Sequence, residues 1–202
     1  MKTAVGCQID RVPVLFSLIG MPGGGKSTVG RHLSKRLGVP LIDTDTVIEE
    51  RLGEPIRGFF EREGEERFRD IEQSVLADVT ARFQGILATG GGIVLRPANR
   101  ELLRERTTVL YLASTPEALY RRLRFDSKRP LLQVADPLGR LQELFAQRDP
   151  LYRETAHFSI ATGRPSVTDF VTTILSQLEL AGLVDPFDIP SVIDPIEAPH
   201  LP

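Results

Sequence analysis

The feature that most constrains the fold of this chain is a glycine-rich segment near its N-terminus. Residues 20–27 read GMPGGGKS and fit the pattern G-x-x-x-x-G-K-[ST]. The apolar run Val14–Ile19 precedes the segment, and Ser27–Leu37 follows it with apolar residues at helical spacing. Between a strand and a helix, backbone N–H groups and the helix N-terminus converge on an anion, so we predict a phosphate-binding loop rather than a plain glycine turn.

The remainder of the chain continues the alternation of strand and helix patterns. Short apolar runs predict further strands at 41–42, 86–89, 108–112 and 158–160. Longer periodic stretches predict helices over 59–79 with a break at Gly64, after a Thr115 cap, over 138–147 and over 167–180, and the pattern Thr46–Glu49 resembles a capping box that opens another. We therefore predict an α/β fold of three layers around a five-stranded parallel sheet.

The limits of the domain follow from composition. We expect residues 1–12 to form an N-terminal tail and residues 13–182 to form one packed domain. Residues 183–202 contain five prolines and four acidic residues without Lys or Arg, so we expect a Pro-rich acidic tail that is extended or disordered. A hydrophobic content of 41% suits a single globular domain.

Charge and hydropathy exclude several classes of function. The net charge of -2 leaves no broad basic surface for nucleic acid or an anionic membrane, and no apolar run approaches the length of a membrane span. The lone cysteine, Cys7, cannot form an internal disulfide, which favours a cytoplasmic protein. Any anion-binding site must therefore be local.

Residues at the phosphate loop and at the end of the second predicted strand suggest how the site works. Lys26 can reach the β- and γ-phosphates of a nucleotide, and the Ser27 hydroxyl can bind Mg²⁺. Asp43 can hold the metal directly or through water, and Asp45 can accept a hydrogen bond or a proton from an attacking hydroxyl. The alternative is that Asp45 or Thr46 only caps the next helix. The chain lacks the Asn-Lys-x-Asp element of a guanine-reading GTPase.

Six separated motifs together resemble the shikimate kinase family, from about Leu18 to about Tyr152. They are GMPGGGKST at 20–28, Asp43-Thr44-Asp45, Phe68-Arg69-Asp70-Ile71-Glu72, Gly90-Gly91-Gly92, Arg129-Pro130-Leu131-Leu132 and Arg148-Asp149-Pro150-Leu151-Tyr152. The resemblance implies a P-loop kinase fold with a small substrate-binding helical region and a lid at about 122–136. It also implies phosphorylation of the 3-hydroxyl of shikimate by ATP, with Mg²⁺, on the pathway to aromatic amino acids.

The resemblance also implies a role for each site residue. The ATP-binding residues would be Gly23, Gly24, Gly25, Lys26, Ser27, Thr28, Arg122 and Arg129; the substrate-binding residues would be Asp45, Arg69, Gly90, Gly91, Gly92 and Arg148. Arg69 and Arg148 would grip the carboxylate of the acceptor, and Arg129 would close over the phosphates.

Each of these roles has a plainer alternative. Arg69 could pair with Glu65 on a helix surface, Arg148 could be a helix-terminal charge, Arg122 could be solvent-exposed, and the glycines could form a strand-end turn. Phe60 and Phe68 could line the acceptor pocket or belong to the core.

Two rival functions remain open at this point. One is a kinase of the same fold that acts on gluconate or a nucleotide, and the other is a non-catalytic sensor with a similar domain. The paired arginines with the triple glycine do not support the first. The sensor predicts losses among Lys26, Asp45 and Arg129, yet all three are present. We expect a monomer whose partners are small molecules.

Overall fold

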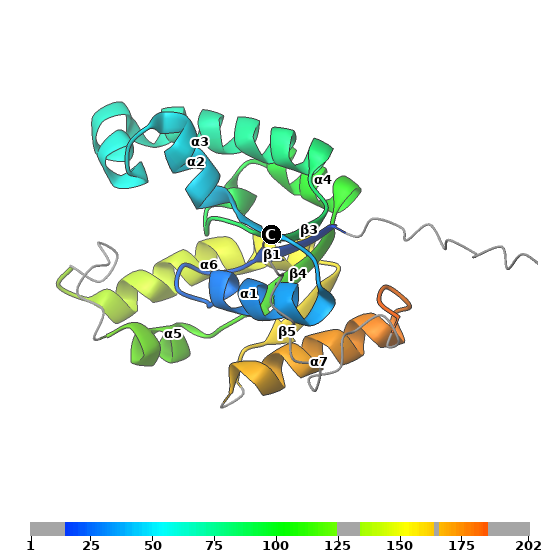
Figure 1. Cartoon of the computed structure of the whole chain (residues 1–202). Helices are drawn as coiled ribbons and strands as arrows, with labels where there is room; N and C mark the ends of the chain where they lie inside the picture. Colours follow the sequence, from blue (N-terminus) through cyan, green and yellow to red (C-terminus); the bar gives the residue numbers. More distant parts are fainter. Residues whose placement is uncertain (1–14, 125–133, 164–165, 186–202) are drawn as a thin grey trace, which may run out of the picture.

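The computed structural model describes residues 15–124, 134–163 and 166–185 (Figure 1). A parallel sheet of five strands has the order β2-β3-β1-β4-β5. The strands are β1 (Leu15–Ile19), β2 (Leu41–Asp43), β3 (Gly85–Ala88), β4 (Thr108–Ala113) and β5 (Phe158–Ala161). The predicted five-stranded parallel sheet is confirmed.

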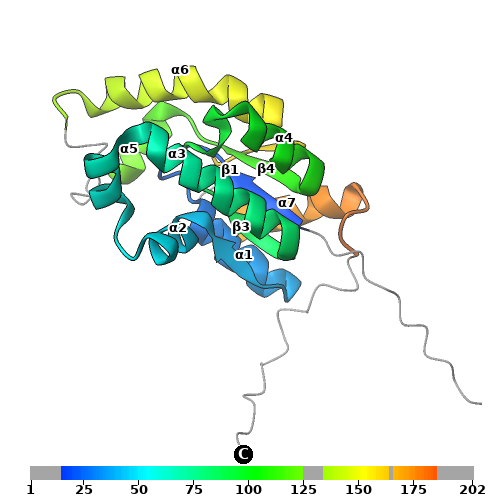
Figure 2. The same cartoon turned by 90° about the horizontal axis from the view of Figure 1, so that it is seen from above.

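Seven α-helices and one 3-10 helix are present within the described residues. They are α1 (Lys26–Leu37), α2 (Thr44–Leu52), α3 (Ile56–Arg82), η1 (Ile93–Leu95), α4 (Pro97–Arg106), α5 (Pro116–Leu123), α6 (Pro137–Thr155) and α7 (Val167–Leu180). Figures 1 and 2 show α1 and α7 on one side of the sheet and α3, α4 and α6 on the other.

Alternation along the central strands divides the core in two. Phe16 and Leu18 of β1 pack with α1 and α7, whereas Leu15 and Ile19 pack with the helices on the other side. Because successive side chains of a strand point to opposite faces, a strand of consecutive apolar residues must be covered on both. The three-layer prediction is thus confirmed.

Several element boundaries differ from the predicted ones. The helix after β2 begins at Thr44, two residues before the predicted capping box, because the Asp43 carboxylate caps it by accepting a hydrogen bond from the Asp45 N–H. Neither Asp45 nor Thr46 is the cap. The break at Gly64 is confirmed, since this residue has φ 82° and ψ 176° inside α3.

The second half of the chain contains two further differences. Helix α6 continues through Pro150 to Thr155 instead of ending near residue 147, and η1 and α4 have no predicted counterpart. Beyond α7, Leu183 and Val184 pack against the core on the α7 side, so the packed chain extends slightly past Gly182. The predicted N-terminal tail and the tail after Asp185 lie outside the described residues.

None of the helices in the described ranges is long and apolar enough to cross a membrane. The direction of the strands determines where the candidate site lies, because all five parallel strands end at the same edge of the sheet. The phosphate loop follows β1, Asp43 ends β2 and the triple glycine follows β3. Ligands of open parallel sheets bind at this edge, where the strand order reverses.

Candidate active site

The phosphate loop connects β1 to α1 as predicted. Gly25 caps α1 in a left-handed conformation, without a side chain in the way, and the first turn of the helix carries no acidic residue. Gly23 has φ 76°, a conformation that favours glycine, and a Cβ atom there would also lie 2.5 Å from the Leu123 side chain of α5. The N-terminus of α1 therefore presents an unobstructed anion-binding end to the cavity.

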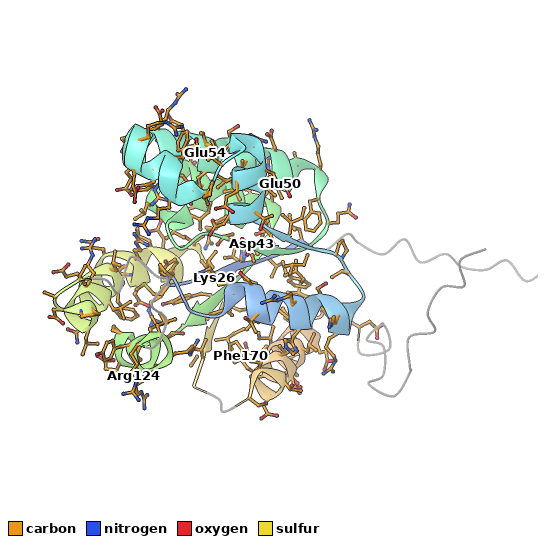
Figure 3. All side chains as sticks on the ribbon, turned by 60° about the vertical axis from the view of Figure 1, so that its left-hand side comes forward. Lys26, Asp43, Glu50, Glu54, Arg124 and Phe170 are labelled. Carbon is orange, nitrogen blue, oxygen red and sulfur yellow. The ribbon has the colours of Figure 1, made fainter. Side chains whose placement is uncertain are left out.

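Lys26 lies buried at the centre of the loop. Its Nζ atom donates to the carbonyl oxygens of Gly20 at 2.8 Å and Met21 at 3.0 Å. Figure 3 shows Lys26 and Asp43 near each other in the middle of the molecule, and both line the same cavity. Carbonyl oxygens at the start of the loop thus hold the ammonium group beside the cavity.

Ser27 and Asp43 form a pair of oxygen donors. The Ser27 hydroxyl donates to Oδ2 of Asp43 at 2.6 Å, while Oδ1 of Asp43 accepts the cap bond from Asp45. The described residues contain no cluster of three His, Cys, Asp or Glu side chains that could enclose a metal. Magnesium typically needs only one or two protein oxygens beside water and phosphate, so this pair fits the ion.

Asp45 lies one residue into α2 and opens onto the cavity. Protein atoms around the carboxyl group displace water, and together with the nearby charge of Asp43 this raises the pKa of Asp45 to about 6, against a partial lowering by Lys26. The Asp45 carboxyl group is open to solvent, and its surroundings disfavour its charged form. A carboxylate of this kind can accept a proton near neutral pH.

The triple glycine after β3 lies against three other parts of the site. A Cβ atom would lie 2.7 Å from the Asp45 carboxylate at Gly90, 2.7 Å from Pro22 at Gly91, and 2.3 Å from the Arg69 guanidinium at Gly92. These close approaches favour a site over a simple strand-end turn. The Gly90 amide itself donates to the Thr44 hydroxyl at 3.1 Å.

Arg69 comes to this loop from α3. Its guanidinium donates to Glu65 at 3.0 Å, which is the surface pair anticipated as an alternative, and also to Glu72 at 2.7 Å. Glu72 is almost completely buried, and burial raises the pKa of its carboxyl group, while the charge of Arg69 opposes that shift. Arg69 also stacks over the ring of Phe68, which is a core residue.

Arg148 comes to the same loop from α6. Its Nη1 donates to the Gly91 carbonyl oxygen at 3.2 Å, and Tyr152 donates to the same oxygen. The Nε atom of Arg148 is buried without a hydrogen-bond partner. A buried donor without a partner is costly, so an acceptor placed beside this atom would offset that cost.

Arg122 of α5 lies beside the phosphate loop. Its Nη1 is 3.7 Å from the position of a Cβ atom on Gly25, and the residue lines the cavity, so it is exposed toward the site rather than away from it. Arg129 and most of the predicted lid lie outside the described residues.

A cavity of about 500 Å³ lies beside the phosphate loop. It is lined by Pro22, Gly23, Gly25, Lys26, Ser27, Thr28, Arg31, Asp43, Asp45, Thr89, Gly91, Arg122 and Leu123. Neither Arg69 nor Arg148 lines this cavity, but Gly91, which does, accepts a hydrogen bond from Arg148, and the next residue, Gly92, lies against the Arg69 guanidinium. The predicted donor side and acceptor side therefore meet at the triple glycine.

Sequence reasoning missed Arg31 as a cavity residue. Arg31 follows Ser27 by four residues on α1, and a helical side chain leans toward the preceding turn, which here is the phosphate-binding end. The i,i+4 spacing was the available signal.

Comparison with known proteins decides the family. The shikimate kinase family model matches residues 22–179. The chain belongs to the shikimate kinase family. A shikimate kinase of Paracidovorax citrulli is 58% identical over 172 residues, covering 84% of this chain and 94% of the relative, and one of Ralstonia nicotianae is 53% identical, covering 83% and 88%.

Solved structures agree with the family. The shikimate kinase of Acinetobacter baumannii in complex with shikimate superposes with a TM-score of 0.79 and 43% identity, covering 85% of this chain and 96% of that one. A gluconokinase of Sinorhizobium meliloti has a TM-score of 0.53 at 18% identity, which shows a shared fold only. The fold alone therefore does not choose the acceptor.

Proposed function

We propose that this member of the shikimate kinase family transfers the γ-phosphoryl group of ATP to the 3-hydroxyl of shikimate, giving shikimate 3-phosphate and ADP on the pathway to aromatic amino acids. The observation that carries the proposal is the meeting of the phosphate loop, Asp45 and two arginines at the triple glycine.

The acceptor would be held by its carboxylate between Arg69 and Arg148. Guanidinium groups bind a planar carboxylate through paired N–H donors, which a lysine cannot do. The buried and unpartnered Nε of Arg148 supplies such a donor. Gly92 leaves room for the Arg69 guanidinium, and Gly90 leaves room for Asp45.

The donor nucleotide would lie along the phosphate loop. Gly23, Gly24 and Gly25 would leave space for the phosphates beside the backbone, Lys26 and Thr28 would bind them, and Arg122 and, by family resemblance, Arg129 would complete the ATP site. Ser27 and Asp43 would hold Mg²⁺. When bound, the metal neutralises charge on the β- and γ-phosphate oxygens.

Asp45 would orient the 3-hydroxyl and accept its proton as the oxygen attacks the γ-phosphorus. The new O–P bond forms while the bond from the γ-phosphorus to the bridging oxygen breaks, and ADP leaves with that oxygen. With a pKa of about 6, Asp45 is mostly a carboxylate at pH 7 and can take the proton. Because this chemistry needs little covalent participation, the protein acts mainly by positioning and charge neutralisation.

Four finer points belong to the same proposal. The enzyme requires Mg²⁺, it acts as a monomer in the cytoplasm, and its partners are small molecules rather than nucleic acid or a membrane. A lone cysteine and a net charge of -2 support the cytoplasmic location and the absence of nucleic acid. Sedimentation velocity at micromolar concentration tests the monomer.

A coupled ADP-release assay with a panel of acceptors tests the function. Shikimate should give acceptor-dependent ADP formation, whereas quinate, gluconate and nucleoside monophosphates should give little. A stronger response to gluconate or a nucleotide would mean that this compound, rather than shikimate, is the acceptor. No response to any acceptor would favour a non-catalytic binding protein.

Two variants with matched controls test the site. Lys26→Ala should abolish turnover, whereas Lys35→Ala, at the far end of the same helix, should not. Arg148→Ala should raise the KM for shikimate by about 100-fold, the effect of removing a charged hydrogen-bond donor, with a smaller change in the KM for ATP. Arg140→Ala, exposed on α6, is its control.

A further inference from the structure

The backbone of α6 lacks a helical hydrogen bond close to Arg148. Pro150 lies inside the helix, two residues after Arg148. Proline has no N–H to donate to the carbonyl of Ala146, and its ring crowds that carbonyl, so the backbone bonding of α6 is interrupted where the arginine must be placed. Contacts from outside the helix must therefore fix this segment.

Tyr111 of β4 supplies those contacts. Its hydroxyl donates to Oδ1 of Asp149 at 2.6 Å, and its ring stacks on that of Tyr152 with centroids 5.1 Å apart. Asp149 directly follows Arg148, and Tyr152 donates to the same Gly91 carbonyl as Arg148. Tyr111 thus holds α6 on both sides of the proline.

The other end of these contacts is the phosphate loop. Tyr111 pairs in register with Ile19, the last residue of β1, and its ring lies 3.6 Å from the position of a Cβ atom on Gly20. One side chain therefore lies beside the start of the phosphate loop and contacts the helix that carries the proposed carboxylate-binding arginine. The distance between donor and acceptor depends on both.

The chemistry of the contact makes it firm. Burial, followed by the bond to Asp149, raises the pKa of Tyr111 well above its ordinary value, so the hydroxyl keeps its proton and stays a donor. The second oxygen of Asp149 accepts from Arg153 at 2.7 Å, so hydrogen bonds to both oxygens fix the orientation of this carboxyl group.

We propose that Tyr111 and Asp149 are positioning residues that fix Arg148 relative to the phosphate loop. The inference rests on the proposed role of Arg148 in holding the acceptor carboxylate. Neither side chain needs to touch a substrate, because both act through the guanidinium group of Arg148.

Steady-state kinetics of Tyr111→Phe test the proposal. This variant keeps the ring and its stacking but removes the bond to Asp149. The KM for shikimate should rise about tenfold, while the KM for ATP should change less than about twofold. Tyr120→Phe, on α5 and outside this group of contacts, is the matched control and should leave both constants unchanged.

Variants of Asp149 separate positioning from general stability. Asp149→Asn retains an acceptor for the Tyr111 hydroxyl and should preserve most of the affinity for shikimate. Asp149→Ala removes it and should match Tyr111→Phe. Equal kinetics for Asn and Ala would overturn the proposal. If Tyr111→Phe fails to fold, the two Asp149 variants test the proposal, because they leave the buried side chains of β4 unchanged.

A double-mutant cycle shows whether the effect passes through Arg148. In an Arg148→Ala background, Tyr111→Phe should change the KM for shikimate by less than about twofold, because the positioned group is already gone. A full tenfold effect in that background contradicts the proposal. If Arg148→Ala alone leaves the KM for shikimate unchanged, the proposed function of the arginine fails instead, which distinguishes the two.

Discussion

An added methyl group at Gly92 would lie 2.3 Å from Nη1 of Arg69, the far end of a flexible side chain. The backbone of Gly92, with φ -97°, suits alanine, so Gly92→Ala should fold and displace the guanidinium instead. The KM for shikimate should rise at least about tenfold, as expected when a charged hydrogen bond is lost. The KM for ATP should stay within twofold, and a variant with normal acceptor affinity would contradict this use of the glycine.

The stability of the protein depends on the buried ion pair between Arg69 and Glu72. Because Glu72 is only 1% exposed, Glu72→Gln leaves the Arg69 charge buried beside a neutral group and should lower the free energy of unfolding by about 3 kcal/mol. Urea denaturation measures it. Glu65 pairs with the same arginine but is 54% exposed, so Glu65→Gln should cost less than about 1 kcal/mol. Equal losses would mean that burial does not govern this pair.

At the scale of the element, α3 contains two glycines in opposite conformations. Gly64 has a positive φ at the break, whereas Gly58 is helical and has room for a Cβ atom at ordinary contact distance from Glu54. Gly64→Ala should therefore destabilise the protein by about 1 kcal/mol or more, and Gly58→Ala should stabilise it by up to about 1 kcal/mol. Thermal unfolding of the two variants should shift in opposite directions, and a shared direction would argue against the break.

The elements also show what sequence could predict. The phosphate loop and the break at Gly64 were predictable because each depends on neighbouring residues. The end of α6 was not, because Pro150 argues locally against the helix while Tyr152 and Leu144 bury it in the core. The contact of Tyr111 with Asp149 spans 38 residues, and no local pattern relates them. The α4 helix was missed because its mean hydropathy is low and its buried residues are few.

At the scale of the whole molecule, the parallel sheet brings distant residues to one edge. The residues proposed to bind ATP follow β1 and β2, and the arginines proposed to bind the acceptor come from α3 and α6, on the side of the sheet opposite α7. The triple glycine after β3 lies against Pro22 and Asp45 on one side and against Arg69 and Arg148 on the other. Charge is concentrated there as well, since Lys26, Asp43 and Asp45 line one cavity. Bringing these charges together lowers the free energy of unfolding of the whole protein.

That cost predicts a dependence of stability on pH. The pKa of Asp45 is about 6 in the folded protein and 3.8 ordinarily, so between those values the folded state binds more protons than the unfolded chain, and stability falls as the pH rises. Asp45→Asn should therefore stabilise the protein above pH 6, by about 1 kcal/mol after allowance for solvent screening, and have little effect below pH 4. Urea denaturation without Mg²⁺ or nucleotide measures this difference. The same variant should lose nearly all turnover, because the amide cannot accept the proton of the acceptor hydroxyl. Equal stability of the two proteins at pH 7.5 would mean that the ionised carboxylate of Asp45 does not destabilise the folded protein in the absence of ligands.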